Sequence, residues 1–170
     1  MNPIKIVKLV AMVASTAVAL WYVFHKQIEW NKDDATVWDQ IFNRLLDRGA
    51  RAEKRAARGK ETPDDLYSTP EQIFLTLAYL ETEVNNGGFD QFFFNTHDSL
   101  NDLLVLSAEA VKAFDIAAIC EQALAIHELQ LEEEEEMKRL EDCDTAFYAS
   151  KDNLTQLVVQ YARETKEFFK

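Results

Sequence analysis

The densest group of reactive side chains in this 170-residue sequence is a run of carboxylates between Glu128 and Asp144. Carboxylates bind metal ions, act as general acids or bases, and pair with basic protein surfaces. The only basic residues within the run are Lys138 and Arg139, so most of its negative charge has no opposite charge nearby in the sequence. We predict a partner-binding surface formed by Glu128, Glu132, Glu133, Glu135, Glu136, Glu141, Asp142 and Asp144.

The spacing of these acids has a specific consequence if the segment is helical. Glu128, Glu132 and Glu136 would form an i, i+4 ladder with neighbours about 6 Å apart, which Glu135 would join. A DNA strand carries one phosphate about every 3.4 Å, so the charge densities agree within a factor of about two. The pattern is compatible with mimicry of nucleic acid, and a solvated helix face, common in soluble proteins, is the alternative.

The sequence predicts no catalytic, metal or cofactor site. It contains no Gly-rich phosphate loop, nucleophile elbow, HExxH motif or CxxC motif. His127 shares an apolar stripe with Cys120 and Leu124, which favours a core or subunit-contact histidine over a metal ligand and leaves a homodimer open. Adjacent carboxylates on a helix also lack the looped geometry that calcium prefers. We therefore predict a non-enzymatic protein without a cofactor.

The two cysteines differ in their expected surroundings. Cys120 lies on an apolar helical face, which predicts a buried thiol. Cys143 is expected in an acidic loop, where the neighbouring charge raises the thiol pKa. A disulfide between them remains open, because it depends on whether the domain is exported.

The elements that position the acids centre on residues 83–95, with the sequence EVNNGGFDQFFFN. Asn and Gly both tolerate a left-handed backbone, so residues 85–88 predict a helix end and a turn. The phenylalanines that follow are three and four residues apart, which places them on one helical face as part of a core. This structural motif comprises Asn85, Asn86, Gly87, Gly88, Phe89, Phe92 and Phe93.

The motif resembles the signature of a bacterial domain family whose best-known members are DNA-mimic proteins. These are small, acidic, all-helical proteins that occupy the DNA-binding surface of a regulator. The resemblance covers residues 63–170, including the tail from Asp144 to Phe169. It implies an all-helical fold and a partner such as a DNA-binding transcription regulator.

Charge is distributed unevenly along the chain. Residues 1–60 contain 11 Lys and Arg against 6 Asp and Glu, and residues 61–170 contain 7 against 24, giving net charges of +5 and −17. The acidic part repels nucleic acid, anionic lipid and acidic substrates, and it attracts cationic protein surfaces. We expect a basic protein surface as partner and no direct contact with nucleic acid.

The N-terminus contains an apolar run that could reach across a membrane. Residues 9–24 are 16 residues without a charge, and residues 4–7 add a further turn. We favour a single-pass anchor through residues 4–24 in a bacterial inner membrane. A cleaved signal peptide, with Ala17-Val18-Ala19 before the cut, and a buried core helix remain open. The basic stretch from Arg48 to Lys60 suits an anionic cytoplasmic leaflet, so we expect the soluble domain in the cytoplasm.

Apolar stripes at helical spacing predict an all-α bundle of about five to six helices, preceded by the N-terminal apolar helix. We divide the chain into an anchor (1–26), a helix with a basic linker (27–62) and an acidic helical domain (63–170).

Capping residues predict several helix boundaries. Asp33 or Asp34 is expected to begin a helix that Gly49 ends, and Thr69 to begin the next, with Pro70 in its first turn. Later stripes predict one helix over residues 100–114 and a last helix over residues 154–168.

The sequence supports two functional hypotheses. The first is a non-enzymatic acidic binding protein that mimics DNA and occupies the basic surface of a DNA-binding regulator. The alternative is a membrane-tethered interaction or scaffold domain whose acidity mainly provides solubility.

Overall fold

The computed structural model describes residues 27–61, 66–97 and 99–169. Within these ranges the chain forms α-helices and one short 3₁₀ helix and contains no strand, which confirms the predicted all-α class. The elements are α2 (Asp34–Ala56), α3 (Thr69–Thr96), α4 (Asn101–Ala110), α5 (Phe114–His127), α6 (Glu133–Ala149), α7 (Leu154–Glu164) and η1 (Lys166–Phe168).

The predicted N-terminal anchor, residues 4–24, lies outside the described residues. Among the residues that the structure does describe, no helix is both long enough and apolar enough to cross a membrane.

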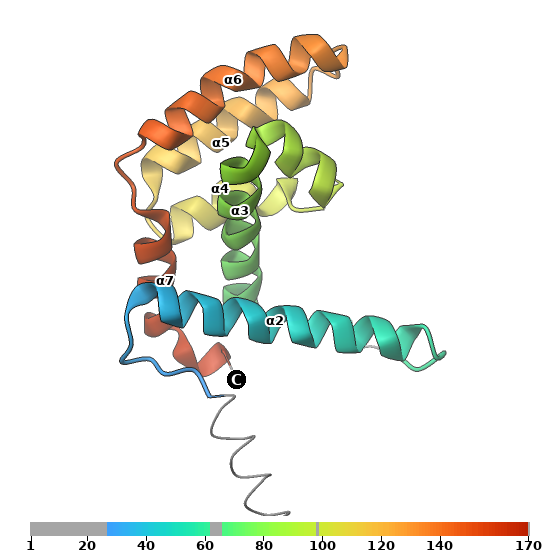
Figure 1. Ribbon diagram of the computed structural model, residues 1–170, viewed down its shortest axis with the longest axis vertical. Coiled ribbons are helices and arrows are strands. Elements are labelled where there is room, and N and C mark those ends of the chain that lie inside the picture. The colour runs from blue at the N-terminus through green and yellow to red at the C-terminus, as the bar shows by residue number, and fades with distance from the viewer. Residues whose placement is uncertain (1–26, 62–65, 98, 170) are drawn as a thin grey trace, which may run out of the picture.

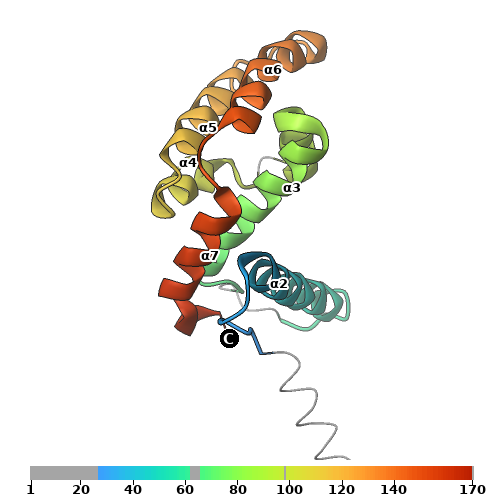
Figure 2. The same ribbon diagram turned by 60° about the vertical axis from the view of Figure 1, so that its left-hand side comes forward.

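Helix α3 runs through the middle of the molecule and contacts α2, α4, α6 and α7 (Figure 1). Helices α5 and α6 lie side by side at one end, and α2 lies at the opposite end against α7 (Figures 1 and 2). The molecule is therefore elongated, with the acidic helix α6 far from α2.

The core follows α3 along its length. Phe74, Phe89 and Phe92 are fully buried, the first near the start of α3 and the other two near its C-terminal end. The ring of Phe74 packs against Phe169 at the C-terminal end of the chain, and the ring of Phe89 packs against Phe147 of α6. Aromatic residues of one helix thus join both ends of the molecule to a continuous core.

Helix α2 begins where the sequence predicts and ends later. The Asp33 side chain accepts the Thr36 backbone N–H at 3.0 Å, which confirms Asp33 as the cap. The predicted end at Gly49 is wrong, because the helix continues to Ala56. A Cβ on Gly49 would lie 2.7 Å from the hydroxyl oxygen of Tyr67, which itself donates to the Leu45 carbonyl. Gly49 therefore allows the Tyr67 hydroxyl to approach the helix.

The second half of α2 is a basic arm. Residues 50–60, which continue past the end of α2 at Ala56, contain five basic residues and one acidic residue, and most of these side chains are exposed. The arm extends away from the rest of the molecule (Figure 1). The stretch predicted as a basic linker is therefore helical as far as Ala56.

A charged cluster joins α2 to the start of α3. Glu71 is buried, accepts the Ser68 backbone N–H at 2.9 Å, and pairs with Arg48 of α2 at 2.8 Å. This arrangement is a capping box, so the cap is Ser68, one residue before the predicted Thr69. Pro70 occupies the first turn as expected.

The predicted single helix over residues 100–114 is wrong. Helix α4 ends at Ala110, and Lys112 adopts a left-handed backbone with φ 65° that redirects the chain. Phe114 begins α5 and is 65% exposed, so it does not continue the buried stripe. A left-handed lysine carries no sequence signal comparable to glycine, which is why the pattern appeared continuous.

The last helix closes the fold. The Asn153 side chain caps α7 by accepting the Gln156 N–H at 3.0 Å. Arg163 donates to the carbonyl oxygens of Trp30 and Lys32 and pairs with Asp34 at 2.5 Å. These contacts fasten the segment before α2 to α7. The predicted last helix ends at Glu164, and residues 166–168 are 3₁₀ instead.

Phe92→Ala is expected to lower the free energy of unfolding by about 3–5 kcal/mol, because it removes a fully buried ring and leaves a cavity. Phe94→Ala removes a ring that is 74% exposed, so we expect a change below about 0.5 kcal/mol. Urea denaturation followed by circular dichroism measures both values. Equal losses in the two variants would contradict this placement of the core.

Candidate partner-binding surface

The Asn-Gly-Gly-Phe motif bends α3 rather than ending it. Gly87 has φ −162° and ψ 21°, and Gly88 has φ 81° and ψ −176°, so neither is helical. The predicted break is therefore confirmed, but the helix resumes at once with Phe89 and continues to Thr96. The motif thus produces two helical segments joined by a sharp bend.

Asp144 of α6 holds the second segment in place. Its Oδ1 accepts the Phe89 backbone N–H at 2.8 Å, which is the function an N-cap side chain performs for a helix start. A Cβ on Gly88 would collide with the same carboxylate, and the positive φ of Gly88 is also unfavourable for other residues. Glycine is required here for two independent reasons.

Further hydrogen bonds brace the bend, one to a backbone carbonyl and two between side chains. The Tyr148 hydroxyl of α6 donates to the Val84 carbonyl at 2.6 Å. Glu83, before the bend, accepts hydrogen bonds from Gln91 and Asn95 after it, both at 2.7 Å. The bend is thereby braced from α6 and from within α3.

The predicted glutamate ladder is wrong. Helix α5 ends at His127, Gln130 adopts a left-handed backbone with φ 49°, and α6 begins only at Glu133. Glu128 and Glu132 therefore lie on the connection between two helices and not on one helix with Glu136. The turn at Gln130 contains neither glycine nor proline, so the sequence pattern did not reveal it.

Glu136 is part of the packing instead. Its carboxylate contacts His127 Nδ1 at 2.5 Å, and the His127 ring stacks on Phe93 at 4.1 Å between centroids with an interplanar angle of 7°. His127 therefore joins α5 to α6 and to the second segment of α3. This contact agrees with the predicted core histidine, and the homodimer alternative stays a prediction.

The remaining predicted acids are mostly exposed at this end of the molecule. Helix α6 carries seven acidic and two basic residues, and acids in its first turn are favoured by the helix dipole. Glu135 pairs with Arg139 at 2.6 Å. The exposed predicted residues are Glu128, Glu132, Glu133, Glu135, Glu141 and Asp142, whereas Glu136 and Asp144 are partly buried.

The structure adds two acids that the prediction omitted. Glu134 is exposed beside Glu133 in the first turn of α6. Asp90 lies in the second segment of α3, where its pKa is raised by burial and then by the carboxylates of Glu136 and Glu133. In the sequence, only its position within the phenylalanine block could have drawn attention to Asp90.

Asp144 faces inward, unlike the outer acids. Burial raises its pKa, and the hydrogen bond from the Phe89 N–H opposes that rise. We refer to residues 128, 132–135, 141 and 142, together with Asp90, as the acidic end. Asp144 is not part of this surface, and it holds the second segment of α3 through the Phe89 N–H.

Exposed apolar side chains accompany these acids. Leu129 in the α5–α6 connection is 56% exposed, and Met137 on α6 is 46% exposed. Phe94 is exposed on the second segment of α3. A surface that combines carboxylates with such side chains can attract a basic partner by charge and bind it by apolar contact.

The structure corrects the surroundings of Cys143. It lies on α6 and is buried, not in an acidic loop, and both cysteines are free thiols. Burial raises the pKa of each thiol, which disfavours the thiolate that reacts as a nucleophile. Among the described residues, no group of three or more His, Cys, Asp or Glu is arranged to hold a metal ion.

This geometry defines a class of protein, an acidic, all-helical domain built around a bent helix. The family model described as DMP19-like protein matches residues 65–165, and the chain belongs to this family. The matched segment contains α3 to α7, and therefore the bend and the acidic end, but not α2. No curated protein and no solved structure matched the chain.

Gly88→Ala is expected to destabilise the protein more than Gly59→Ala, by at least about 1–2 kcal/mol in the free energy of unfolding. Both glycines have positive φ, but a Cβ on Gly59 meets nothing within 4 Å, whereas a Cβ on Gly88 meets Asp144. The Gly59 variant therefore controls for the positive φ, and Gly88 adds both the Asp144 contact and a ψ of −176° that side chains rarely adopt at positive φ. Chemical denaturation compares them, and equal losses would show that the Asp144 contact is not restrictive.

Proposed function

We propose that this protein is a non-enzymatic binding protein whose acidic end occupies the DNA-binding surface of a transcription regulator in place of DNA. The best-known members of the family that it resembles act in this way. The observation that carries the proposal is the gathering of exposed carboxylates at the α5–α6 end of an elongated fold.

The arrangement of charge supports this function in three respects. The exposed glutamates 132–134 precede the two basic residues of α6, so the start of the helix is its most negative part. The helix dipole stabilises these charges without neutralising them. The basic arm of α2 lies at the far end of the molecule, which leaves the field of the acidic end uncancelled nearby (Figure 1).

The exposed apolar residues provide close-fitting contacts, which charge alone does not provide. Long-range attraction increases the rate of association, but specificity depends on groups that fit the partner closely. Leu129 and Met137 lie among the acids and are available for such contacts. The partner is therefore expected to have a basic surface with apolar positions within it.

Replacing Glu132, Glu133 and Glu134 by glutamine is expected to weaken DNA release by about tenfold or more, because three exposed charges are lost without loss of a described contact. Partners are captured from a bacterial lysate with the full chain, loaded with labelled duplex DNA, and titrated with each variant. Fluorescence anisotropy at several salt concentrations measures the released DNA.

The matched control replaces Glu53, Glu109 and Glu167 by glutamine. These residues are also exposed, lie outside the acidic end, and remove the same total charge. The control is expected to release DNA as the wild type does. If the wild type releases none, or if both variants behave alike, the DNA-mimic proposal fails and general solubility explains the acidity.

A second candidate function is a membrane-tethered scaffold domain, and the basic arm is the observation that favours it. Its positive charge and its distance from the acidic end suit an anionic membrane surface on one side and a protein partner on the other. Under this function the captured partners would not bind DNA. The identity of the captured proteins therefore separates the two candidates.

A further inference from the structure

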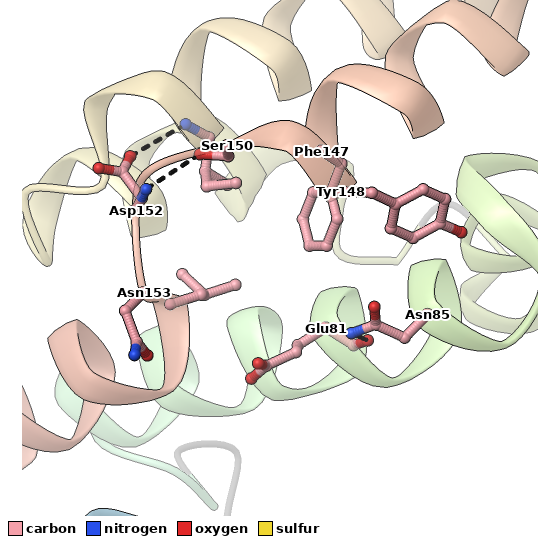
Figure 3. Close-up of a pocket in the computed structure, with 9 residues that line it drawn as sticks. Glu81, Asn85, Phe147, Tyr148, Ser150, Asp152 and Asn153 are labelled. Atoms are coloured by element: carbon pink, nitrogen blue, oxygen red, sulfur yellow. Dashed lines mark hydrogen bonds between the residues drawn. The ribbon is translucent and has the colours of Figure 1, made fainter.

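A pocket lies on the other side of the bend from the acidic end, between α3, the start of α5 and the link from α6 to α7. Its volume is about 260 Å³. Figure 3 shows Glu81 and Asn85 of α3 on one wall, Phe147 and Tyr148 of α6 on another, and Asp152 and Asn153 in the link.

The charge of the pocket is negative. Two of its nine lining residues, Glu81 and Asp152, are acidic, and none of the nine is Lys or Arg. Asp152 is already engaged, because its Oδ2 accepts the backbone N–H groups of Asp115 and Ile116 at 2.9 and 3.2 Å and so caps α5. Glu81 is the carboxylate that faces the pocket with the fewest protein contacts.

A hydrogen bond holds the Glu81 side chain in place. Its Oε1 accepts the Thr155 hydroxyl at 2.8 Å, which fixes the direction of the side chain. Burial raises the pKa of Glu81, because the ionised form loses hydration there, and the Thr155 hydrogen bond opposes this rise. A cation in the pocket would restore the lost stabilisation of the charged form.

The aromatic wall suits a flat cation. Phe147 is buried. The Tyr148 hydroxyl donates to the Val84 carbonyl at 2.6 Å, which holds the Tyr148 ring in place. The Asn85 Nδ2 donates to the Glu81 carbonyl at 2.7 Å, which leaves its Oδ1 as an acceptor. Carboxylate, amide oxygen and aromatic ring together match a guanidinium group, which donates in a plane and stacks on rings.

We propose that this pocket receives the guanidinium group of one arginine side chain from the basic protein partner. The inference rests on the proposed function for the source of that arginine. The volume is smaller than that of drug-sized ligand sites, typically about 300–1,000 Å³, and suits one long side chain. The acidic end would then supply attraction, and the Glu81 pocket one buried, specific contact.

The probe for this site is N-acetyl-L-arginine amide, added to the full chain in nonionic detergent and followed by backbone amide shifts of Ser150 and Thr155. Saturable binding in the millimolar range is expected. N-acetyl-L-citrulline amide has nearly the same shape without the charge and is expected not to bind. The lysine analogue is expected to bind more weakly than arginine, because it lacks the planar fork.

Glu81→Gln keeps the size of the side chain and an acceptor for Thr155, and is expected to weaken binding of the arginine probe by at least about tenfold. Asn85→Lys, at an exposed position of the wall, places a cation at the pocket and is expected to abolish binding even if the first variant is poorly folded. Glu109→Gln removes the same charge at an exposed site outside the pocket and is expected to change nothing.

The outcomes separate this inference from the proposed function. Equal binding of citrulline and arginine amides, no binding of either, or unchanged binding in both pocket variants would overturn the arginine site. DNA release by the wild type in that case would leave the proposed function standing. Arginine binding that depends on Glu81, with no DNA release by the wild type, would support the pocket and reject the DNA-mimic function.

Discussion

The hydrogen bond from the Phe89 backbone N–H to the Asp144 carboxylate fixes the direction in which α3 continues after its bend. Gly88 has no Cβ and so allows the Asp144 carboxylate to approach the backbone closely. Tyr148, which like Asp144 lies on α6, donates a hydrogen bond to the Val84 carbonyl before the bend. Phe93 of the second segment then stacks on the His127 ring, and His127 contacts the Glu136 carboxylate. Together these contacts join α3 to α5 and α6, the two helices of the acidic end, so the placement of that surface depends on the bend.

The acidic end concentrates like charges that repel each other, and the fold offsets part of that cost. Glutamates in the first turn of α6 lie at the positive end of the helix dipole, and one is paired with Arg139. Glu136 is directed inward to His127. The outer carboxylates remain exposed to solvent, where hydration stabilises them and where a basic surface can reach them. The acids of one helix thus divide into those that pack inward and those that, under the proposed function, attract a partner.

Helical periodicity and capping residues predicted the all-α class, the cap at Asp33 and the break at residues 85–88, because these features depend on neighbours in the sequence. The helical spacing of Phe89, Phe92 and Phe93 also predicted the helix after the break. Its cap could not be predicted, because that cap comes from Asp144, 55 residues away.

Other errors have similar physical causes. The glycine at position 49 leaves space for the Tyr67 hydroxyl and does not end the helix. The left-handed residues Lys112 and Gln130 are not glycines, so two helix boundaries had no local signal. For the candidate site, most acids were predicted to be exposed and are, but the roles of Glu136 and Asp144 follow from tertiary contacts. The Glu81 pocket arises from several elements and left no pattern in the sequence.

Amide hydrogen exchange at Phe89 tests the central claim, that Asp144 holds the bend of α3. In the wild type the Phe89 amide is expected to be strongly protected, because its N–H donates to a half-buried carboxylate. In Asp144→Ala this amide and those of the second segment, up to Thr96, are expected to exchange faster, whereas the first segment before the bend keeps its protection. Rapid exchange of Phe89 in the wild type, or unchanged exchange in the variant, would contradict the account.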